Sequence, residues 1–395
     1  MRHPSTPDLG EHVEFIETQQ AFDQRLPQLL EGRQLAIDTE AASFHRYHDR
    51  VYLLQVSSRT ETLVVDPLAV GDLGLLGEAL ADRQVEVVFH DADYDLRLLE
   101  RQYAFRAARL FDTRVAAQLL DEPGIGLAAL LEKHLGVALD KRFQRADWSQ
   151  RPLTTEMLRY AATDTMHLLE LRDRLAAALD AAGRLAWAEE EFALLEQVRW
   201  TEGDDEPAWL RMKGAKALRP RELATLRELH GWRDELAQRL DRAAFRILNN
   251  EPLLAIAKAL PADLDALRGI AGIGPETLTR RGAQLLAAVE RARALPEQAL
   301  PRVERPPRRS PDLVLEARVE RLKQRRNALA PALGLQPGVL CPNGTLEAIA
   351  RLAPTTLEEL ATVPGLRTWQ RGAIGRELLD VIPEPAPAGG PADPQ

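Results

Sequence analysis

Cysteine is almost absent from this sequence of 395 residues, in which Cys341 is the single example. One cysteine excludes an internal disulfide and any zinc site built on a cysteine cluster, which fits a reducing compartment. The stretch MRHPSTPDLGEHVEF at the start has no apolar segment of the signal-peptide kind, and no apolar run approaches membrane-spanning length. We therefore expect a cytoplasmic protein with no membrane partner.

The motifs of several common enzyme classes are missing as well. The sequence has no G-x-S-x-G nucleophile motif, no phosphate-binding P-loop and no H-E-x-x-H zinc motif. Its eight histidines are scattered, and His90 and His167 are expected to have hydrogen-bonded structural roles. Serine hydrolase, P-loop nucleotidase and zinc protease chemistry therefore find no support.

Negative charge is abundant, but only in the first half of the chain. Residues 1–200 hold 22 Lys and Arg against 34 Asp and Glu, a balance of −12, whereas the remainder holds 29 against 26, a balance of +3. An acidic half repels a polyanion unless cations bind there, while the second half can attract one.

The first 200 residues alternate runs rich in valine, isoleucine and leucine with amphipathic stretches, which indicates strands and helices. The expected strands are 33–40, 51–58, 62–67 and 85–90. The expected helices are 75–82, 93–105, 114–121, 127–136 and one long segment, 154–182. Closely spaced strands followed by mixed elements predict an α/β domain with a mixed sheet covered by helices.

From about residue 217 the pattern favours helices alone, and it contains an internal repeat. LLAIAKALPADLDALRGIAGI (253–273) aligns with LEAIARLAPTTLEELATVPGL (346–366) at a constant offset of 93 residues. The register extends upstream, where Arg233 aligns with Arg326. Two copies of one helical module are therefore predicted.

These patterns divide the chain into five segments. Residues 1–206 form the α/β domain, 215–296 the first module and 312–383 the second. Residues 297–311 are rich in proline and arginine, which is typical of an extended linker. The proline-rich tail 384–395 is expected to be disordered.

Two acidic motifs follow predicted strands. In LAIDTE (35–40) the alternation of a strand points Asp38 and Glu40 to the same face, although a pair at a strand end can also simply face solvent. In HDADYD (90–95) Asp91 and Asp93 suit the first turn of a helix, where acids cap free N–H groups. Asp95 lies one helical turn after Asp91 and directly before an apolar run, so capping of the helix does not explain an acidic residue there.

A third motif lies in the segment 154–182. Asp164 occupies the apolar stripe of this predicted helix, and Tyr160 lies one turn before it. A lone inward aspartate can be satisfied by an arginine or by backbone donors. Carboxylates from a strand, a helix start and a second helix are, however, the oxygen ligands that hard divalent cations prefer. Two such ions about 3.5–4 Å apart stabilise the attacking and leaving oxygens of phosphoryl transfer, and a phenol can orient the attacking water.

The set D-x-E, a later aspartate behind a strand-ending histidine, and Y-x-x-x-D resembles the DEDD exonuclease superfamily in its tyrosine-bearing branch. Asp38 and Glu40 match the first motif, Asp95 the second, and Tyr160 with Asp164 the third. LFDTRVAAQLL (110–120) and LDKRFQRADWSQRPLT (139–154) are similar to stretches of the bacterial ribonuclease D family. The two modules resemble HRDC domains, so the resemblance extends from residue 13 to 383.

The resemblance implies a ribonuclease H-like mixed sheet followed by two all-α HRDC-type domains. It also implies a 3′-to-5′ exoribonuclease with two divalent metal ions, Mg²⁺ or Mn²⁺, that releases nucleoside 5′-monophosphates. Asp38 would bridge both ions, Glu40 and Asp164 would complete one site, and Asp95 would hold the second, partly through water. Tyr160 would face the attacking water. The implied substrates are single-stranded 3′ ends of RNA, and the implied task is the trimming of tRNA precursors.

Candidate RNA contacts lie next to these motifs. The family usually continues after D-T-E with an aromatic residue, whereas this chain has Ala41. The resemblance therefore implies the metal ligands but does not imply a substrate preference. Phe44 is a candidate for stacking, with a core position as the alternative. Lys141, Arg142 and Arg145 are candidates for contacts with the RNA backbone, with packing and salt bridges as the alternative.

Other features have plainer explanations. Asp112 before a helical run is expected to cap a helix. Gly272 is expected to end one, although a phosphate-facing turn is the alternative. The basic stretches RPPRRS and ARVERLKQRRNALA can contact phosphates or form a solvated face.

Two other functions use the same features. A DNA 3′-to-5′ exonuclease would need the same five residues, but the HRDC pair and the ribonuclease D-like stretches argue against it. A non-catalytic RNA-binding adaptor would be expected to have lost a ligand, and the motifs are intact.

Overall fold

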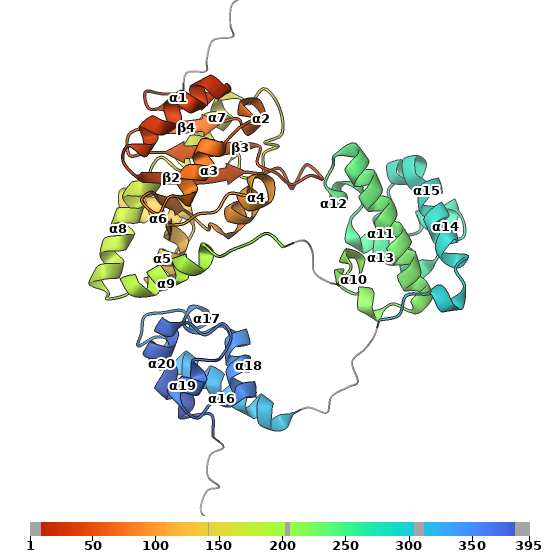
Figure 1. Cartoon of the computed structure of the whole chain (residues 1–395). Helices are drawn as coiled ribbons and strands as arrows, with labels where there is room; N and C mark the ends of the chain where they lie inside the picture. Colours follow the sequence, from red (N-terminus) through yellow and green to blue (C-terminus); the bar gives the residue numbers. More distant parts are fainter. Residues whose placement is uncertain (1–8, 141, 202–205, 304–311, 384–395) are drawn as a thin grey trace, which may run out of the picture.

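The computed structural model describes residues 9–140, 142–201, 206–303 and 312–383. Lys141, the proposed tail and part of the proposed linker lie outside the described residues. The chain forms an α/β domain followed by two helical modules, as expected (Figure 1). Every helix in the described part is too short or too polar to reach across a lipid bilayer.

A mixed sheet of six strands forms the centre of the α/β domain. The strands, in the order in which they pair, are β1 (Val13–Ile16), β4 (Thr62–Val65), β3 (Leu53–Ser57), β2 (Gln34–Glu40), β5 (Glu86–Phe89) and β6 (Leu110–Asp112). β3 runs antiparallel to β2 and β4, and the other pairs are parallel. The four predicted strands are present, and β1 and β6 extend the sheet at its edges.

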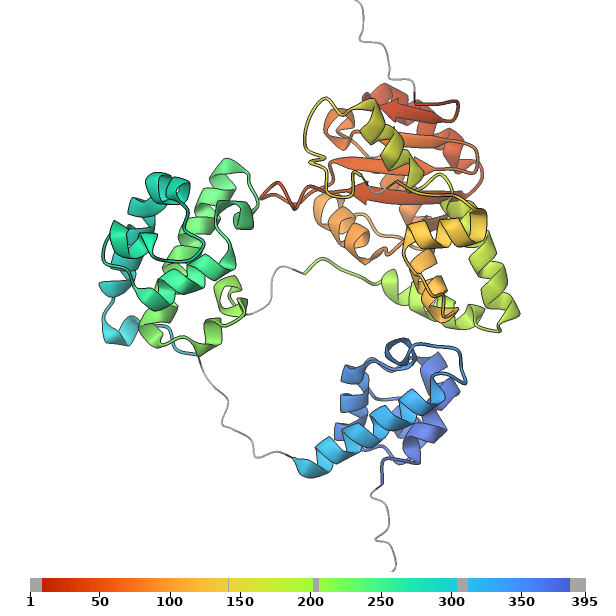
Figure 2. The ribbon, with the colours of Figure 1, turned by 180° about the vertical axis from the view of Figure 1, so that it is seen from behind.

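Helices cover both faces of this sheet. They are α1 (Gln19–Leu30), α2 (Pro67–Val70), α3 (Gly74–Ala81), α4 (Asp93–Tyr103), α5 (Thr113–Leu119), α6 (Leu127–Leu135), α7 (Thr155–Thr163), α8 (Leu168–Ala181) and α9 (Leu185–Leu195). Figures 1 and 2 show α3 on one side of the sheet and α7 on the other. On the α7 side, Met157 and Ala161 pack with Leu53 and Val64 from the sheet.

The expected single helix over 154–182 is wrong. The segment forms two helices, α7 and α8, and Asp164 is the residue that ends α7. Thr165 follows the break, and its hydroxyl lies 2.7 Å from the hydroxyl of Ser57 on β3. Both residues are fully buried, so this hydrogen bond ties the break to the sheet.

The two helical modules have matching elements, as the repeat predicts. After α10 (Ala208–Arg211) and the 3₁₀ turn η1 (Ala215–Ala217), the first contains α11 (Pro220–Leu240), α12 (Ala244–Ile247), α13 (Asn250–Ala259), α14 (Leu264–Arg268) and α15 (Pro275–Arg293). After a 3₁₀ turn η2 (Glu297–Ala299), the second contains α16 (Leu313–Leu329), α17 (Pro337–Leu340), α18 (Asn343–Leu352), α19 (Leu357–Leu360) and α20 (Thr368–Leu379). Each helix from α16 to α20 begins 93 residues after its counterpart.

A buried arginine holds each module together in the same way. Arg233 donates to the backbone oxygen of Leu248 and to the side-chain oxygen of Asn250, at 3.0 and 2.8 Å. Arg326 makes the equivalent bonds to Cys341 and Asn343, at 2.7 and 2.8 Å. Gly272 has a φ of 87°, but α14 already ends at Arg268, so this glycine turns the chain toward α15 instead of ending a helix.

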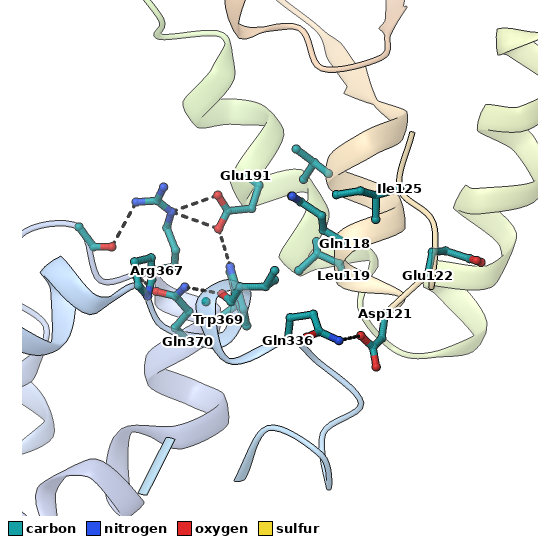
Figure 3. A pocket seen from close by; sticks show the side chains of 15 residues that line it. Gln118, Leu119, Asp121, Glu122, Ile125, Glu191, Gln336, Arg367, Trp369 and Gln370 are labelled. Atoms are coloured by element: carbon teal, nitrogen blue, oxygen red, sulfur yellow. Dashed lines mark hydrogen bonds and ion pairs between the residues drawn. The ribbon is translucent and has the colours of Figure 1, made fainter. Parts of the chain in front are cut away.

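The second module packs against the α/β domain through α9. The rings of Trp187 and Trp369 stack with their centroids 4.8 Å apart, and Glu191 accepts hydrogen bonds from Arg367 and from the Trp369 indole. Glu190 accepts the backbone N–H groups at the start of α20. A cavity of about 490 Å³ lies at this junction (Figure 3), and the acidic motifs do not contribute to its lining.

Candidate active site

The strand β2 places Asp38 and Glu40 on one face of the sheet. Ile37, which precedes Asp38, is fully buried on the opposite face, so the strand cannot turn over without exposing it. β3 fixes the register by pairing Gln55 with Asp38 and Leu53 with Glu40. The two carboxylates therefore stand side by side on a rigid element.

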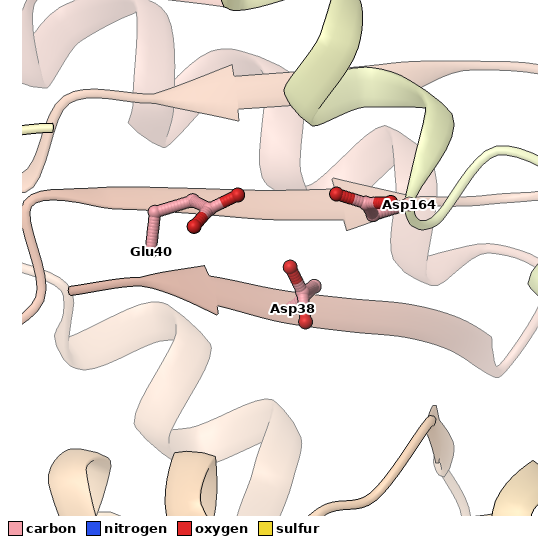
Figure 4. A group of neighbouring side chains, drawn as sticks. All are labelled: Asp38, Glu40 and Asp164. Carbon is pink, nitrogen blue, oxygen red and sulfur yellow. The ribbon is translucent and has the colours of Figure 1, made fainter. Parts of the chain in front are cut away.

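The end of α7 delivers the third carboxylate. Thr154 caps the start of the helix by accepting from the Met157 N–H at 3.2 Å, and Asp164 ends it. One carboxylate oxygen each of Asp38, Glu40 and Asp164 lies within 4.8 Å of the others. Figure 4 shows the three side chains pointing toward one another, two from the strand and one from the helix end.

Asp95 approaches the group from the first turn of α4. It is buried, with 7% of its surface exposed, and it accepts a hydrogen bond from the Thr39 hydroxyl. Its charge raises the pKa of Glu40, and Asp38 raises the pKa of Asp95 in turn. Asp95 lies outside the tight group of three, so the structure brings it to the edge of the cluster.

The pocket concentrates negative charge in a poorly solvated place. Burial raises the pKa values of Asp38, Glu40 and Asp95 well above their usual range, and the neighbouring carboxylates raise them further. Burial also raises the pKa of Asp164 to about 7. Within the described residues, none of the four forms an ion pair with a lysine or arginine.

Such a set of carboxylates fits divalent cations. Converging oxygen donors without a protein counter-charge are what Mg²⁺ and Mn²⁺ require, and bound cations would remove the repulsion. An arginine partner, the alternative explanation for an inward Asp164, is not found in the described part of the chain.

Tyr160 is held next to the cluster by an aromatic cage. Its ring is 8% exposed, and it contacts Trp148 and Phe143 with centroids 6.2 and 5.6 Å away. Burial first, and then the charges of Asp164 and Glu40, raise the pKa of its phenol. The hydroxyl is therefore protonated at neutral pH and available as a hydrogen-bond donor.

The residues predicted to contact RNA do not form one group. Phe44 is 50% exposed, so the alternative of a core position is excluded. Arg145 lies over its ring at 5.5 Å from the centroid, while Arg142 pairs with Asp140. Lys141 lies outside the described residues.

The predicted helix cap at Asp112 is confirmed. Its carboxylate accepts the backbone N–H groups of Arg114 at 2.8 Å and Val115 at 3.1 Å, at the start of α5. It also accepts the Ala92 N–H at 2.7 Å, which joins α5 to the start of α4. Asp112 therefore supports the position of Asp95 from a neighbouring element.

Sequence reasoning missed Gln55. It pairs with Asp38 across the two strands, and directly opposed residues of an antiparallel pair face the same side. Gln55 is fully buried, and neither side-chain amide atom is hydrogen-bonded within the described residues. A polar residue inside the apolar run VYLLQVSS was the available signal.

Comparisons with known proteins identify the family of each domain. Residues 13–180 match the model of the 3′-5′ exonuclease family, and residues 222–289 and 316–382 match that of the HRDC domain. Ribonuclease D of Gluconacetobacter diazotrophicus is 35% identical over 87% of this chain and 86% of its own length.

Two solved structures share the fold of the whole chain. A protein from Bifidobacterium adolescentis superposes with a TM-score of 0.81 at 25% identity, covering 96% of this chain and 99% of its own. Escherichia coli RNase D, described as an exoribonuclease involved in structured RNA processing, superposes with a TM-score of 0.70 at 25% identity. That match covers 94% of this chain and 99% of the other.

The mixed sheet, its clustered carboxylates and the matched exonuclease model define the class of this protein: it is a 3′-5′ exonuclease with two HRDC domains. Within that class, the chain belongs to the ribonuclease D family.

Proposed function

We propose that this protein removes nucleotides one at a time from the 3′ ends of RNA, using two divalent metal ions, Mg²⁺ or Mn²⁺, held by Asp38, Glu40, Asp95 and Asp164. The products would be nucleoside 5′-monophosphates. The observation that supports this most strongly is the convergence of carboxylates from β2, α4 and α7, for which the described part of the chain offers no lysine or arginine partner. Negative charge gathered in this way is costly to the fold unless protons or bound cations offset it.

Different residues of the chain would have different roles in hydrolysis. When bound, the ions would supply Lewis acidity at the scissile phosphate and offset the charge of the pocket. Asp38 and Glu40, fixed by the register of β2 with β3, would hold the ligand geometry. Tyr160 would orient the attacking water through its hydroxyl, because its raised pKa keeps the phenol protonated at neutral pH. Trp148 and Phe143 limit the motion of its ring.

The substrates we propose are RNA precursors with unpaired 3′ ends, tRNA precursors among them, in the cytoplasm. The relatives named ribonuclease D and the HRDC pair favour RNA over DNA. We also propose the division into an exonuclease domain (1–206) and HRDC domains at 215–296 and 312–383, with 297–311 as the linker and 384–395 as a tail.

A cleavage assay tests this function. The protein is incubated with 5′-labelled single-stranded RNA or DNA of one sequence, with magnesium, manganese or EDTA. We expect a ladder that shortens the RNA from its 3′ end only when metal is present, and mononucleotides with a 5′-phosphate as products. RNA blocked by a 3′-phosphate serves as the substrate control.

Matched variants locate the activity. Asp164→Asn should abolish the ladder, whereas Asp180→Asn, an exposed aspartate on α8, should leave it unchanged. Equal or faster degradation of DNA would favour a DNA exonuclease instead. A wild-type protein that binds RNA but cleaves nothing in either metal would contradict the proposal and favour an adaptor.

A further inference from the structure

A long segment between β2 and β3, residues 41–52, leaves the active site and reaches the first HRDC domain at α12 (Figure 1). Hydrogen bonds fix it there. The backbone N–H of Ala243 donates to the oxygen of His45 at 3.1 Å, and the Tyr47 hydroxyl donates to Asp234 at 3.0 Å. Asp241 accepts the backbone N–H of Tyr47 at 3.2 Å. The segment that follows the first acidic motif is therefore anchored on another domain.

Two aromatic rings meet at this junction without being buried by it. Phe44 and Phe245 lie edge to face, with centroids 6.2 Å apart, yet they remain 50% and 46% exposed. Arg145 stands over Phe44 at 5.5 Å from its centroid, and Arg246 lies 6.0 Å from the centroid of Phe245. Both arginines are exposed, and Arg246 also donates to the backbone oxygen of Phe44. Exposed rings flanked by cations are what proteins use to stack unpaired bases and hold the adjoining phosphates.

The fold of the module does not require these side chains. Ninety-three residues later in the chain, the second module has Gly338 in place of Phe245 and Val339 in place of Arg246, and it forms the same short helix. Asp241, which anchors the segment, is likewise replaced by Gly334. The copy that lacks these side chains folds in the same way, so they serve something other than the stability of the module.

The surface around Phe245 is hollowed on both sides. A hollow of about 360 Å³ lies between Phe245 and residues Ser43 and Tyr47 of the segment. Another, of about 420 Å³, lies between Phe245 and residues Pro252 and Gly272 of the module. Phe245 therefore lines both concave surfaces and keeps 46% of its surface exposed between them.

We propose that Phe44 and Phe245, with Arg145 and Arg246, form a subsite for unpaired nucleotides of the RNA, upstream of the 3′ end at the carboxylates. The inference rests on the proposed function, since it takes RNA as the ligand. Phe44 follows Glu40 by four residues, so the two lie at most roughly 14 Å apart along an extended chain. A strand that ends at the carboxylates passes this distance within a few nucleotides. The first HRDC domain would then hold the same single strand that the exonuclease domain cleaves.

The test compares substrates of two lengths in the full-length protein. Phe245→Leu and Phe44→Leu keep an apolar side chain but remove the stacking face. For a single-stranded RNA long enough to cover the subsite, we expect KM to rise roughly 5- to 150-fold, the range of base–aromatic stacking, with kcat unchanged. Cleavage of a dinucleotide, which lacks the nucleotides a few positions upstream that the subsite would hold, should keep its wild-type kcat and KM. Phe245→Tyr, which retains the ring, should restore the wild-type KM.

An abasic nucleotide gives a second readout that a structural role would not produce. Moved along the RNA, it should weaken binding to wild type at one or two upstream positions. In Phe245→Leu the same substitution should cause no further loss, because the stacking partner is already absent. Trp200→Leu is the matched control, since Trp200 is also exposed and lies under Arg101 at 4.3 Å, but it belongs to a different surface.

The outcomes separate this inference from the proposed function. If wild type degrades RNA and Phe245→Leu leaves KM for the long substrate unchanged, the subsite is refuted and the exonuclease remains. If the variants lose kcat equally on the dinucleotide, the pair only positions the segment beside Glu40, which also refutes the subsite. If wild type degrades no RNA in either metal, both proposals fall together.

Discussion

Removing one charge from the carboxylate cluster should stabilise the metal-free protein, although it removes activity. In the folded state, Asp164 lies within 4.8 Å of both Asp38 and Glu40. Two unit charges at that separation repel by about 3 kcal/mol at an effective dielectric constant of about 20. Burial makes a separate contribution, because it raises the pKa of Asp164 to about 7. Compared with its usual value of 3.8, this pKa corresponds to about 4 kcal/mol when the group is ionised.

The sign of the pH dependence follows from the same shift. The folded protein keeps the Asp164 proton up to about pH 7, whereas the unfolded chain releases it near pH 3.8. The free-energy cost of ionising Asp164 in the folded protein is therefore absent below pH 3.8, grows between pH 3.8 and about pH 7, and is complete above about pH 7. Asp164→Asn should raise the free energy of unfolding of the exonuclease domain by about 4 kcal/mol at pH 8 and by about 2 kcal/mol at pH 5.

The assay is thermal unfolding in EDTA, followed by calorimetry. At pH 8 the exonuclease transition of Asp164→Asn should lie on the order of 10 °C above that of wild type. Adding Mn²⁺ should reverse the order, because the ion stabilises wild type and binds the variant more weakly. Asp180→Asn is the control and should follow wild type. If Asp164→Asn melts at or below the wild-type temperature in EDTA at pH 8, the cluster is compensated in some other way and the metal assignment loses its basis.

Three further predictions address neighbouring groups. Tyr160→Phe should lower kcat about 100-fold or more with RNA affinity unchanged; a large loss in a binding assay would instead make Tyr160 a substrate contact. Gln55→Leu should leave the metal-free protein at least as stable as wild type, because it removes a buried amide that has no hydrogen-bond partner among the described residues. The same variant should have lower activity, and full activity in the cleavage assay would show that the amide has no role. Burial and the charge of Arg114 lower the pKa of His90 to about 4. The unfolded chain therefore takes up a proton that the folded protein does not, and the free energy of unfolding falls by about 3 kcal/mol between pH 6.5 and pH 4. Urea unfolding of His90→Gln should therefore lose less stability over that range, and an equal loss would contradict the shift.

Much of the site could be predicted because it depends on local periodicity. The alternation of a strand places Asp38 and Glu40 on one face whatever the rest of the chain does. The repeat likewise predicts two modules of one fold, since the same spacing of apolar residues recurs at an offset of 93. Asp112 before a helical run carries its own capping signal.

The features that were missed depend on contacts between distant parts of the chain. The apolar stripe continues in phase through Asp164, so nothing local shows that α7 ends there. The break is tied to the sheet by the hydrogen bond between the hydroxyls of Thr165 and Ser57, which are distant in sequence. The meeting of Phe44 with Phe245 joins residues that are far apart in sequence, and only the placement of the HRDC domain produces it. The partner of Asp38 on β3, Gln55, required the register of the strands.

The second HRDC domain returns to α9, the last helix of the exonuclease domain before the chain continues to the first HRDC domain (Figure 1). Both of the short helices α12 and α17 lie close to exonuclease contacts, but on different parts of that domain. A tethered domain is present at an effective concentration in the millimolar range, so contacts such as the Trp187–Trp369 stack can be weak and still be made almost all the time. Cutting the chain between the two HRDC domains should nevertheless leave the second domain in place on α9, because that domain is tethered to the rest of the chain by these contacts as well as by the segment that was cut.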